Sequence, residues 1–220
     1  LHLSPATGTY TVGSTFTVSV LLNTGGEFVN AVEAKLEFPP DKLQVVTPSL
    51  GISIIDVWTN QPSFDNQTGL LSFTGGVPDP GINTDKGVIS TVSFRVKSVG
   101  PALIKFLDQS KVLLNDGLGT NILIDTDNAL FNLVLPPPRG PLVVSETHPD
   151  QSRWYSTNTA ILRWTNNNLA EGYSYVLNQE PIDIPDNISE GVRNQVTYKE
   201  LPDGLHFFHV KALRGGVWGE

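Results

Sequence analysis

The sequence predicts an all-β protein built as two β-sandwiches. Its 220 residues include 20 Gly and 16 Pro but no Cys and no Met. No segment shows the sustained apolar period of about 3.6 residues that marks a long helix. Short segments that alternate apolar and polar residues recur instead, separated by turns that contain Gly or Pro. This pattern is typical of strands with one buried face.

The clearest alternation covers residues 31–38. One face of this strand is expected to enter a core while the other meets solvent. The inward set is Val32, Ala34, Leu36 and Phe38, and the outward set is Ala31, Glu33, Lys35 and Glu37. Because Pro39 and Pro40 cannot donate backbone hydrogen bonds, we predict a corner there and a second strand over 43–46.

The first domain is predicted to span residues 1–136 and to contain about nine strands, at the close spacing of a sandwich. Residues 58–65, WTNQPSFD, are expected to form an irregular loop, and residues 77–87 a long surface loop. The predicted strands are 15–22, 31–38, 43–46, 52–55, 70–73, 88–97, 102–106, 111–114 and 131–135.

A proline-rich linker over residues 137–140 is predicted to separate the two domains. Consecutive prolines favour an extended, stiff backbone and cannot join a sheet. The second domain, residues 141–220, is predicted to be a smaller all-β unit that lacks its last strand, leaving an uncovered edge. Its expected strands are 142–144, 160–164, 173–177, 192–198 and 205–213, with a short sixth.

Charge and composition exclude several classes of function. The 22 acidic and 14 basic residues give a net charge of −8, which argues against nucleic acid or an anionic membrane as partner. No run approaches the roughly 20 apolar residues that span a bilayer. Without Cys, neither disulfides nor thiolate metal sites are available. Since the chain opens at Leu1 and not at Met, we expect an excised fragment.

The first domain resembles a cohesin domain, the module with which bacterial scaffoldins hold dockerin-bearing proteins. The resemblance rests on five segments in the order and at the spacing of that family: TYTVGSTFTVSVLLN, AVEAKLEFPPDKLQVV, DKGVISTVSFRVKS, VLLNDGLGTNIL and LFNLVL. It implies a nine-stranded jelly-roll β-sandwich and recognition of a protein partner, possibly a dockerin, on one sheet face. It also implies an extracellular or cell-surface bacterial location, with calcium held by the dockerin and no cofactor in this chain.

The resemblance also implies partner-binding residues. Ala31 and Glu33 stand where many cohesins carry Asn and Asp, and Glu33 can accept a hydrogen bond whereas Ala31 cannot. Gly75 or Gly76 stands at the position of an acidic residue in the family, and Leu118 matches a hydrophobic contact. The predicted partner-binding residues are therefore Glu33, Lys35, Gly76 and Leu118.

The second domain resembles a fibronectin type III or immunoglobulin-like domain. Trp164 on the second expected strand and VKA at residues 210–212 carry this resemblance. Such units usually space or present other modules, so no site is predicted there.

No catalytic or metal-binding residue is predicted. His206 and His209 lie three apart on an expected strand and would face opposite sides, so they cannot share one ion. Glu33 and Glu37 would lie roughly 13 Å apart along a strand, too far for a glycosidase pair. No Ser, His and Asp occupy a nucleophile motif.

Three functional hypotheses remain. The first is a non-catalytic, monomeric protein-recognition module, as the resemblance implies. The second is a carbohydrate-binding module that uses Trp58, the one Trp of the first domain, on a polysaccharide. The third is a structural stalk with no ligand of its own.

Overall fold

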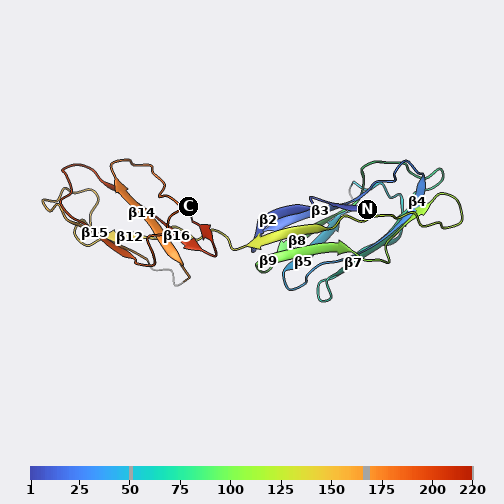
Figure 1. Cartoon of the computed structure of the whole chain (residues 1–220), viewed down its shortest axis with the longest axis horizontal. Helices are drawn as coiled ribbons and strands as arrows, with labels where there is room; N and C mark the ends of the chain where they lie inside the picture. The colour runs from blue at the N-terminus through green and yellow to red at the C-terminus, as the bar shows by residue number, and fades with distance from the viewer. Residues whose placement is uncertain (50–51, 166–168, 220) are drawn as a thin grey trace. The chain divides into compact units, whose positions relative to one another are not determined.

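The computed structural model describes residues 1–49, 52–165 and 169–219. It divides into two compact units, Leu1–Val134 and Leu135–Glu220, and all the described regular structure is β (Figure 1). The described residues contain no helix that could cross a membrane. The all-β prediction is confirmed.

The first unit is a sandwich of two sheets. One sheet has the order β1-β3-β8-β5, and the other has the order β2-β11-β9-β4-β7-β6 with β10 paired to β4. Its strands are β1 (His2–Ser4), β2 (Thr7–Thr11), β3 (Thr15–Leu22), β4 (Val29–Glu37), β5 (Leu43–Ser49), β6 (Val57–Asp65), β7 (Leu70–Gly76), β8 (Gly87–Val96), β9 (Gly100–Phe106), β10 (Lys111–Leu114) and β11 (Ala129–Val134).

The N-terminal segment contributes to both sheets. Strand β1 pairs antiparallel with β3 in the four-stranded sheet, whereas β2 pairs parallel with β11 in the seven-stranded sheet. Pro5 lies between them, where its missing amide proton interrupts the ladder. Since the segment passes from one sheet to the other, it joins the two layers at this side of the sandwich.

Strand β4 supplies the middle of the core, as the sequence predicts. Val32, Ala34 and Leu36 are buried, and so is Phe38, whose ring meets that of Phe94 edge-on at 5.5 Å between centroids. The predicted corner is also confirmed. β4 ends at Glu37 and β5 begins at Leu43, whose amide donates to the Pro39 carbonyl at 2.9 Å.

Two local predictions are wrong. Residues 58–65, expected as a loop, belong to strand β6, whereas 52–55, expected as a strand, do not form one. β6 is an edge strand with breaks in register against β7 and mostly exposed side chains, so it lacks the alternation that reveals half-buried strands. Ile55 is buried in the core without being in a strand.

The described part of the first unit therefore has eleven strands where the sequence predicts about nine. Beyond β6, the additional strands are β1 and β2, which are short and carry little alternation.

The described residues of the second unit form two three-stranded sheets, β12-β13-β15 and β14-β16-β17. Trp164, Tyr173 and Ala212 form a buried cluster, and partly buried side chains from both sheets pack around them. Ala160 and Leu162 are also buried. The expected segments are confirmed as strands, including the short sixth: β12 (Val143–Ser145), β13 (Ala160–Trp164), β14 (Gly172–Asn178), β15 (Gln195–Tyr198), β16 (Phe207–Arg214) and β17 (Val217–Trp218). The proline run is attached to this unit, since Arg214 Nη2 donates to the Pro136 carbonyl at 2.8 Å.

The burial of β4 predicts a pair of unequal leucine substitutions. Leu36 is 1% exposed, whereas Leu70, on the neighbouring strand, is 44% exposed. Leu36→Ala should lower the free energy of unfolding of the first unit by about 2–5 kcal/mol, because it leaves a cavity. Leu70→Ala should lower it by less than about 1 kcal/mol. Denaturant unfolding followed by circular dichroism measures both, and equal losses would contradict this assignment of the two faces.

Candidate functional site

The outer faces of the two sheets of the first unit differ in chemistry. On the four-stranded sheet, the outward positions in the middle of β3 and β8 carry hydroxyl groups, and Ser19 Oγ lies 3.1 Å from Thr91 Oγ1 across the strands, while Arg95 is the exposed residue of β8. The outer face of the seven-stranded sheet carries charged side chains and exposed apolar ones, including Leu103 and Leu130, which pair directly. Charged and apolar groups together offer a partner both orientation and contact area, so the seven-stranded face is the candidate site.

Strand β4 forms the centre of this face because other strands pair along both of its edges. Antiparallel partners align side chains in rows across the sheet. One row joins β10, β4, β7 and β6 through Lys111, Glu33, Thr74 and Asn60. A second row runs through Leu113, Ala31, Gly76 and Val57.

Glu33 lies between two lysines on this face. Its carboxylate oxygens are 3.1 Å from Lys35 Nζ and 3.9 Å from Lys111 Nζ, and its side chain is 30% exposed. Exposed ion pairs of this kind contribute little to folding stability. Their effect here is to hold the carboxylate in place and balance its charge.

A second ion pair lies further along β4. Glu37 Oε2 is 2.9 Å from Lys105 Nζ on the neighbouring strand β9. Together the two clusters place three lysines and two glutamates on the face, so it is nearly neutral although the chain carries a net charge of −8.

Ser110 completes the backbone pairing of β4 where β9 leaves it and β10 begins. Its hydroxyl donates to the Lys35 carbonyl at 3.2 Å and accepts from the Lys35 amide at 3.1 Å, and the residue is 3% exposed. The Leu107 amide also donates to the Lys35 carbonyl, at 2.8 Å. These contacts fill the gap between two pairing strands, so the backbone of β4 is hydrogen-bonded at Lys35 as well.

Leu118 projects from a fixed loop after β10. Its side chain is 86% exposed, while its amide donates to Asp116 Oδ1 at 2.8 Å. The Thr120 hydroxyl donates to the other carboxylate oxygen of Asp116. These two hydrogen bonds lower the pKa of Asp116 below its ordinary value, and the bond from Thr120 has the larger effect. The loop therefore presents an apolar side chain from a backbone that is already ordered.

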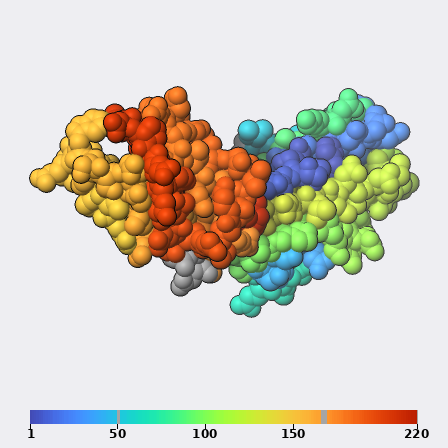
Figure 2. Space-filling view, turned by 60° about the vertical axis from the view of Figure 1, so that its left-hand side comes forward, coloured from blue at the N-terminus to red at the C-terminus, as the bar shows by residue number. Residues whose placement is uncertain are grey.

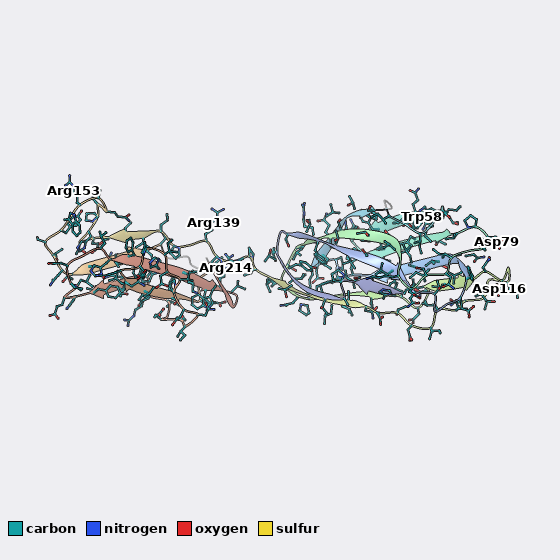
Figure 3. The ribbon with its side chains drawn as sticks, turned by 90° about the horizontal axis from the view of Figure 1, so that it is seen from above. Trp58, Asp79, Asp116, Arg139, Arg153 and Arg214 are labelled. Carbon is teal, nitrogen blue, oxygen red and sulfur yellow. The ribbon has the colours of Figure 1, made fainter. Side chains whose placement is uncertain are left out.

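A shallow groove of about 480 Å³ lies beside this loop, lined in part by Asn30, Gly76, Asp79 and Asn115. Asn115 Nδ2 donates to Asp79 Oδ1 and to the Pro80 carbonyl, each at 3.0 Å, so the loop at 77–82 is joined to the end of β10. Figure 3 shows Asp79 and Asp116 at the same end of the unit. A Cβ at Gly76 would come within 2.6 Å of the Asn30 carbonyl, so this position requires glycine.

The structure brings three of the four predicted partner-binding residues onto one surface. Glu33 and Lys35 lie on the outer face of β4, and Gly76 pairs with Ala31 one row away. Leu118 follows β10, which runs along β4 and ends opposite Val29. Its loop therefore lies at the end of the face where β4 begins.

Trp58 lies on the other side of the same sheet. It pairs with Gly75 on the inward-facing side of β7, and its ring meets that of Phe73 edge-on at 6.0 Å between centroids. Trp58 is partly buried, and its ring packs against the core on this side of the sheet. Figure 3 shows where it lies in the first unit.

Sequence reasoning missed several residues that shape the site. Lys105 and Lys111 become relevant only through the register that places them beside Glu37 and Glu33. Ser110 lies between two strands and outside any segment of alternating residues, so the sequence gives no sign of its role. Asp116 had a local signal, because Asp followed by Gly in NDGLG is typical of a turn closed by the side-chain carboxylate.

His206 and His209 each form a hydrogen bond with a backbone carbonyl. His206 Nε2 lies 2.9 Å from the Pro202 carbonyl, and His209 Nε2 lies 3.0 Å from that of Glu180. Among residues 1–49, 52–165 and 169–219, no group of three or more His, Cys, Asp or Glu side chains could hold a metal ion.

Comparison with known proteins assigns a family to most of the first unit. Residues 2–128 match the family described as the cohesin domain. Among solved structures, the chain is similar to the third cohesin of ScaC from Acetivibrio cellulolyticus, solved in complex with the ScaB dockerin. The two chains are 17% identical, the match covers 60% of this chain and 98% of that chain, and the TM-score is 0.51. It is also similar to the type I complex Coh-OlpC-Doc435 from Clostridium thermocellum, with 14% identity, coverages of 61% and 92%, and a TM-score of 0.51.

At these identities the structural similarity supports the fold alone, and it confirms the predicted sandwich. A search of curated proteins gave no match.

The Leu118 loop generates a titration prediction. Because hydrogen bonds lower the pKa of Asp116, they stabilise the loop above the ordinary aspartate pKa, and this contribution is lost as the pH falls through the lowered value. Thr120→Val removes the first of these donors and should raise the pKa of Asp116 toward its ordinary value. Carboxyl-carbon NMR titration measures this change.

Asp150 serves as an internal control for that titration. Asp150 lies in the second unit, where a hydrogen bond from the Ser152 hydroxyl lowers its pKa. This pKa should be the same in the unsubstituted chain and in Thr120→Val. An unchanged pKa of Asp116 in Thr120→Val would show that the hydroxyl does not hold the loop.

Proposed function

Because this chain belongs to the cohesin domain family, whose members are non-catalytic modules that bind dockerins, we propose that its first unit binds a dockerin through the outer face of the seven-stranded sheet. The observation that carries the proposal is the position of β4. It presents Glu33 and Lys35 on a strand that is paired along both edges, and the hydrogen-bonded loop that exposes Leu118 lies at the end of the same face.

The exposed Leu118 side chain is the apolar anchor of the proposed interface. Interfaces gain most of their affinity from a few side chains that become fully buried. Leu118 is 86% exposed, and its backbone amide is tied to Asp116. Binding would therefore bury this leucine with little further loss of backbone freedom.

The charged rows provide orientation. Glu33 can accept a hydrogen bond from a partner hydroxyl while Lys35 and Lys111 balance its charge. Ala31, in the next row, offers only a methyl group. We therefore propose that the partner places a Ser or Thr hydroxyl opposite Glu33 and an apolar side chain opposite Ala31.

The remaining parts of the proposal concern context. Calcium would be held by the dockerin and not by this chain. We propose that the second unit is a spacer of the fibronectin type III or immunoglobulin type and that the protein acts outside a bacterial cell or on its surface. Carbohydrate binding through Trp58 is not proposed, because that ring packs on the core side of its sheet.

A calorimetric titration tests the proposal. The full chain is titrated with a panel of calcium-loaded dockerins, and at least one member should bind with a stoichiometry of one. Leu118→Ala should weaken that binding by about 30-fold or more, the loss expected when an apolar side chain that is fully buried in an interface is truncated. Glu33→Gln should weaken it less, because an amide oxygen still accepts a hydrogen bond.

Ile182→Ala is the matched control, since Ile182 is 92% exposed in the second unit and outside the proposed face. The Ile182→Ala protein should bind the same dockerin with the affinity of the unsubstituted chain. Absence of binding to every dockerin would overturn the proposal, and so would a Leu118→Ala protein that binds as tightly as the control.

A further inference from the structure

A lysine of the second unit is buried without a carboxylate partner. Lys211 lies on β16 and is 6% exposed, whereas lysine side chains usually keep their ammonium group in water. Among the described residues, no Asp or Glu oxygen lies within ion-pair distance of Lys211 Nζ. Because an unpaired ammonium is costly to bury, some other feature must offset this cost.

Two uncharged groups surround the ammonium instead. Lys211 Nζ donates to Asn187 Oδ1 at 2.6 Å, and it lies over the ring of Trp218, 5.3 Å from the centroid. The indole face attracts a cation, and the amide oxygen accepts one hydrogen bond. Neither group removes the charge, so the lysine is an unpaired cation in contact with a carboxamide.

The outer face of the sheet formed by β14 and β16 carries this lysine. Ala212 faces the core, so Lys211, the residue before it, faces the opposite side. Ser174 lies directly across from Lys211 on β14 and is 1% exposed. The segment at 179–190 bonds to both side chains and covers them. In Figure 2 this segment, in orange, lies at the surface of the second unit.

A carboxylate is held beside the lysine and the carboxamide. Asp186 Oδ1 accepts from the Ser174 hydroxyl at 3.2 Å and from the Ile188 amide at 2.9 Å. Asp186 precedes Asn187 in the chain, while Ser174 is the cross-strand neighbour of Lys211. The carboxyl group of Asp186 is therefore close to both members of the pair, where it can take up and return protons.

We propose that Lys211 Nζ and Asn187 Cγ form an amide bond, which joins the segment at 179–190 covalently to β16. The reaction needs an amine, a carbonyl carbon and a group that carries protons, and Lys211, Asn187 and Asp186 supply them. The chain has no Cys, so this bond would take the place of a disulfide in closing a loop between residues 24 apart. The inference concerns the second unit alone and does not rest on dockerin binding.

The reaction conserves atoms and charge without any further reactant. The Asp186 carboxylate takes a proton from the Lys211 ammonium, and the neutral amine then attacks Cγ of Asn187. The Nζ–Cγ bond forms, and the Cγ–Nδ2 bond breaks. Asp186 returns its proton to Nδ2, which leaves as ammonia, and the attacking nitrogen loses a second proton to that ammonia. A lysine ammonium and a carboxamide thus become a secondary amide and an ammonium ion.

Three properties of the cluster favour this reaction. The hydrogen bond keeps the amine beside the carbonyl group, so the two reactants are already positioned within one molecule. The product is neutral, which removes the unpaired buried charge. Asn187 lies in an exposed part of its segment, so the ammonia can pass directly into solvent.

Mass spectrometry of the intact full chain tests the proposal. The purified protein should be lighter than its sequence mass by one ammonia molecule. After protease digestion, one product should contain the peptide with Asn187 joined to the peptide with Lys211. A mass equal to the sequence mass would overturn the proposal. Loss of ammonia confined to a single peptide around Asn187 would also overturn it, because that product is a cyclic imide formed with the next backbone amide.

Three substitutions test the role of each group, and each protein is compared with the mass of its own sequence. Lys211→Arg keeps the positive charge but should show no loss of mass. Asp186→Asn should show none either, because it keeps a hydrogen-bond acceptor but cannot carry the proton. Asn187→Asp should lose one water molecule in place of ammonia.

Asp183→Asn is the matched control for Asp186→Asn. Asp183 lies on the same segment, but its carboxylate accepts from Asn178 and not from Ser174. The Asp183→Asn protein should lose ammonia as completely as the unsubstituted chain. Equally complete loss in Asp186→Asn would overturn the assignment of Asp186 as the proton carrier.

Discussion

The first unit depends on one constraint: β4 must bury one face in the core while its backbone is paired along both edges beneath the outer face. Val32, Ala34 and Leu36 meet the first requirement through burial. Pairing with β7 on one side and with β9 and β10 on the other meets the second. Ser110 closes the gap between β9 and β10, so the strand that carries Glu33 and Lys35 has no loose segment.

The sequence was sufficient for those features that local alternation determines. The inward side chains of β4 and the corner at Pro39 follow from the two-residue period and from the missing amides of proline. Strand β6 was not predictable in this way, because an exposed edge strand has no buried face to impose alternation. The orientation of Trp58 was missed for the same reason.

The site was predictable only in part. Glu33, Lys35 and Leu118 were proposed from the resemblance to cohesin domains, and the alternation over 31–38 predicted only that Glu33 and Lys35 face outward. The ion pair between Lys111 and Glu33 depends on which strands become neighbours and in which register, and residues 78 apart in sequence give no local signal of that. The anchoring of the Leu118 loop combines both kinds of information, since the Asp116 turn is local whereas the contact between Asn115 and Asp79 is not.

The central claim is that the outer face of the seven-stranded sheet binds a protein partner. The most direct test is to follow backbone amide NMR signals of the full chain during titration with a dockerin that binds it. The account predicts shifts concentrated at Glu33, Thr74 and Leu118, with the exposed residues of β3 and β8 unaffected. Shifts concentrated instead on the hydroxyl-rich face around Thr17 and Ser93 would contradict it.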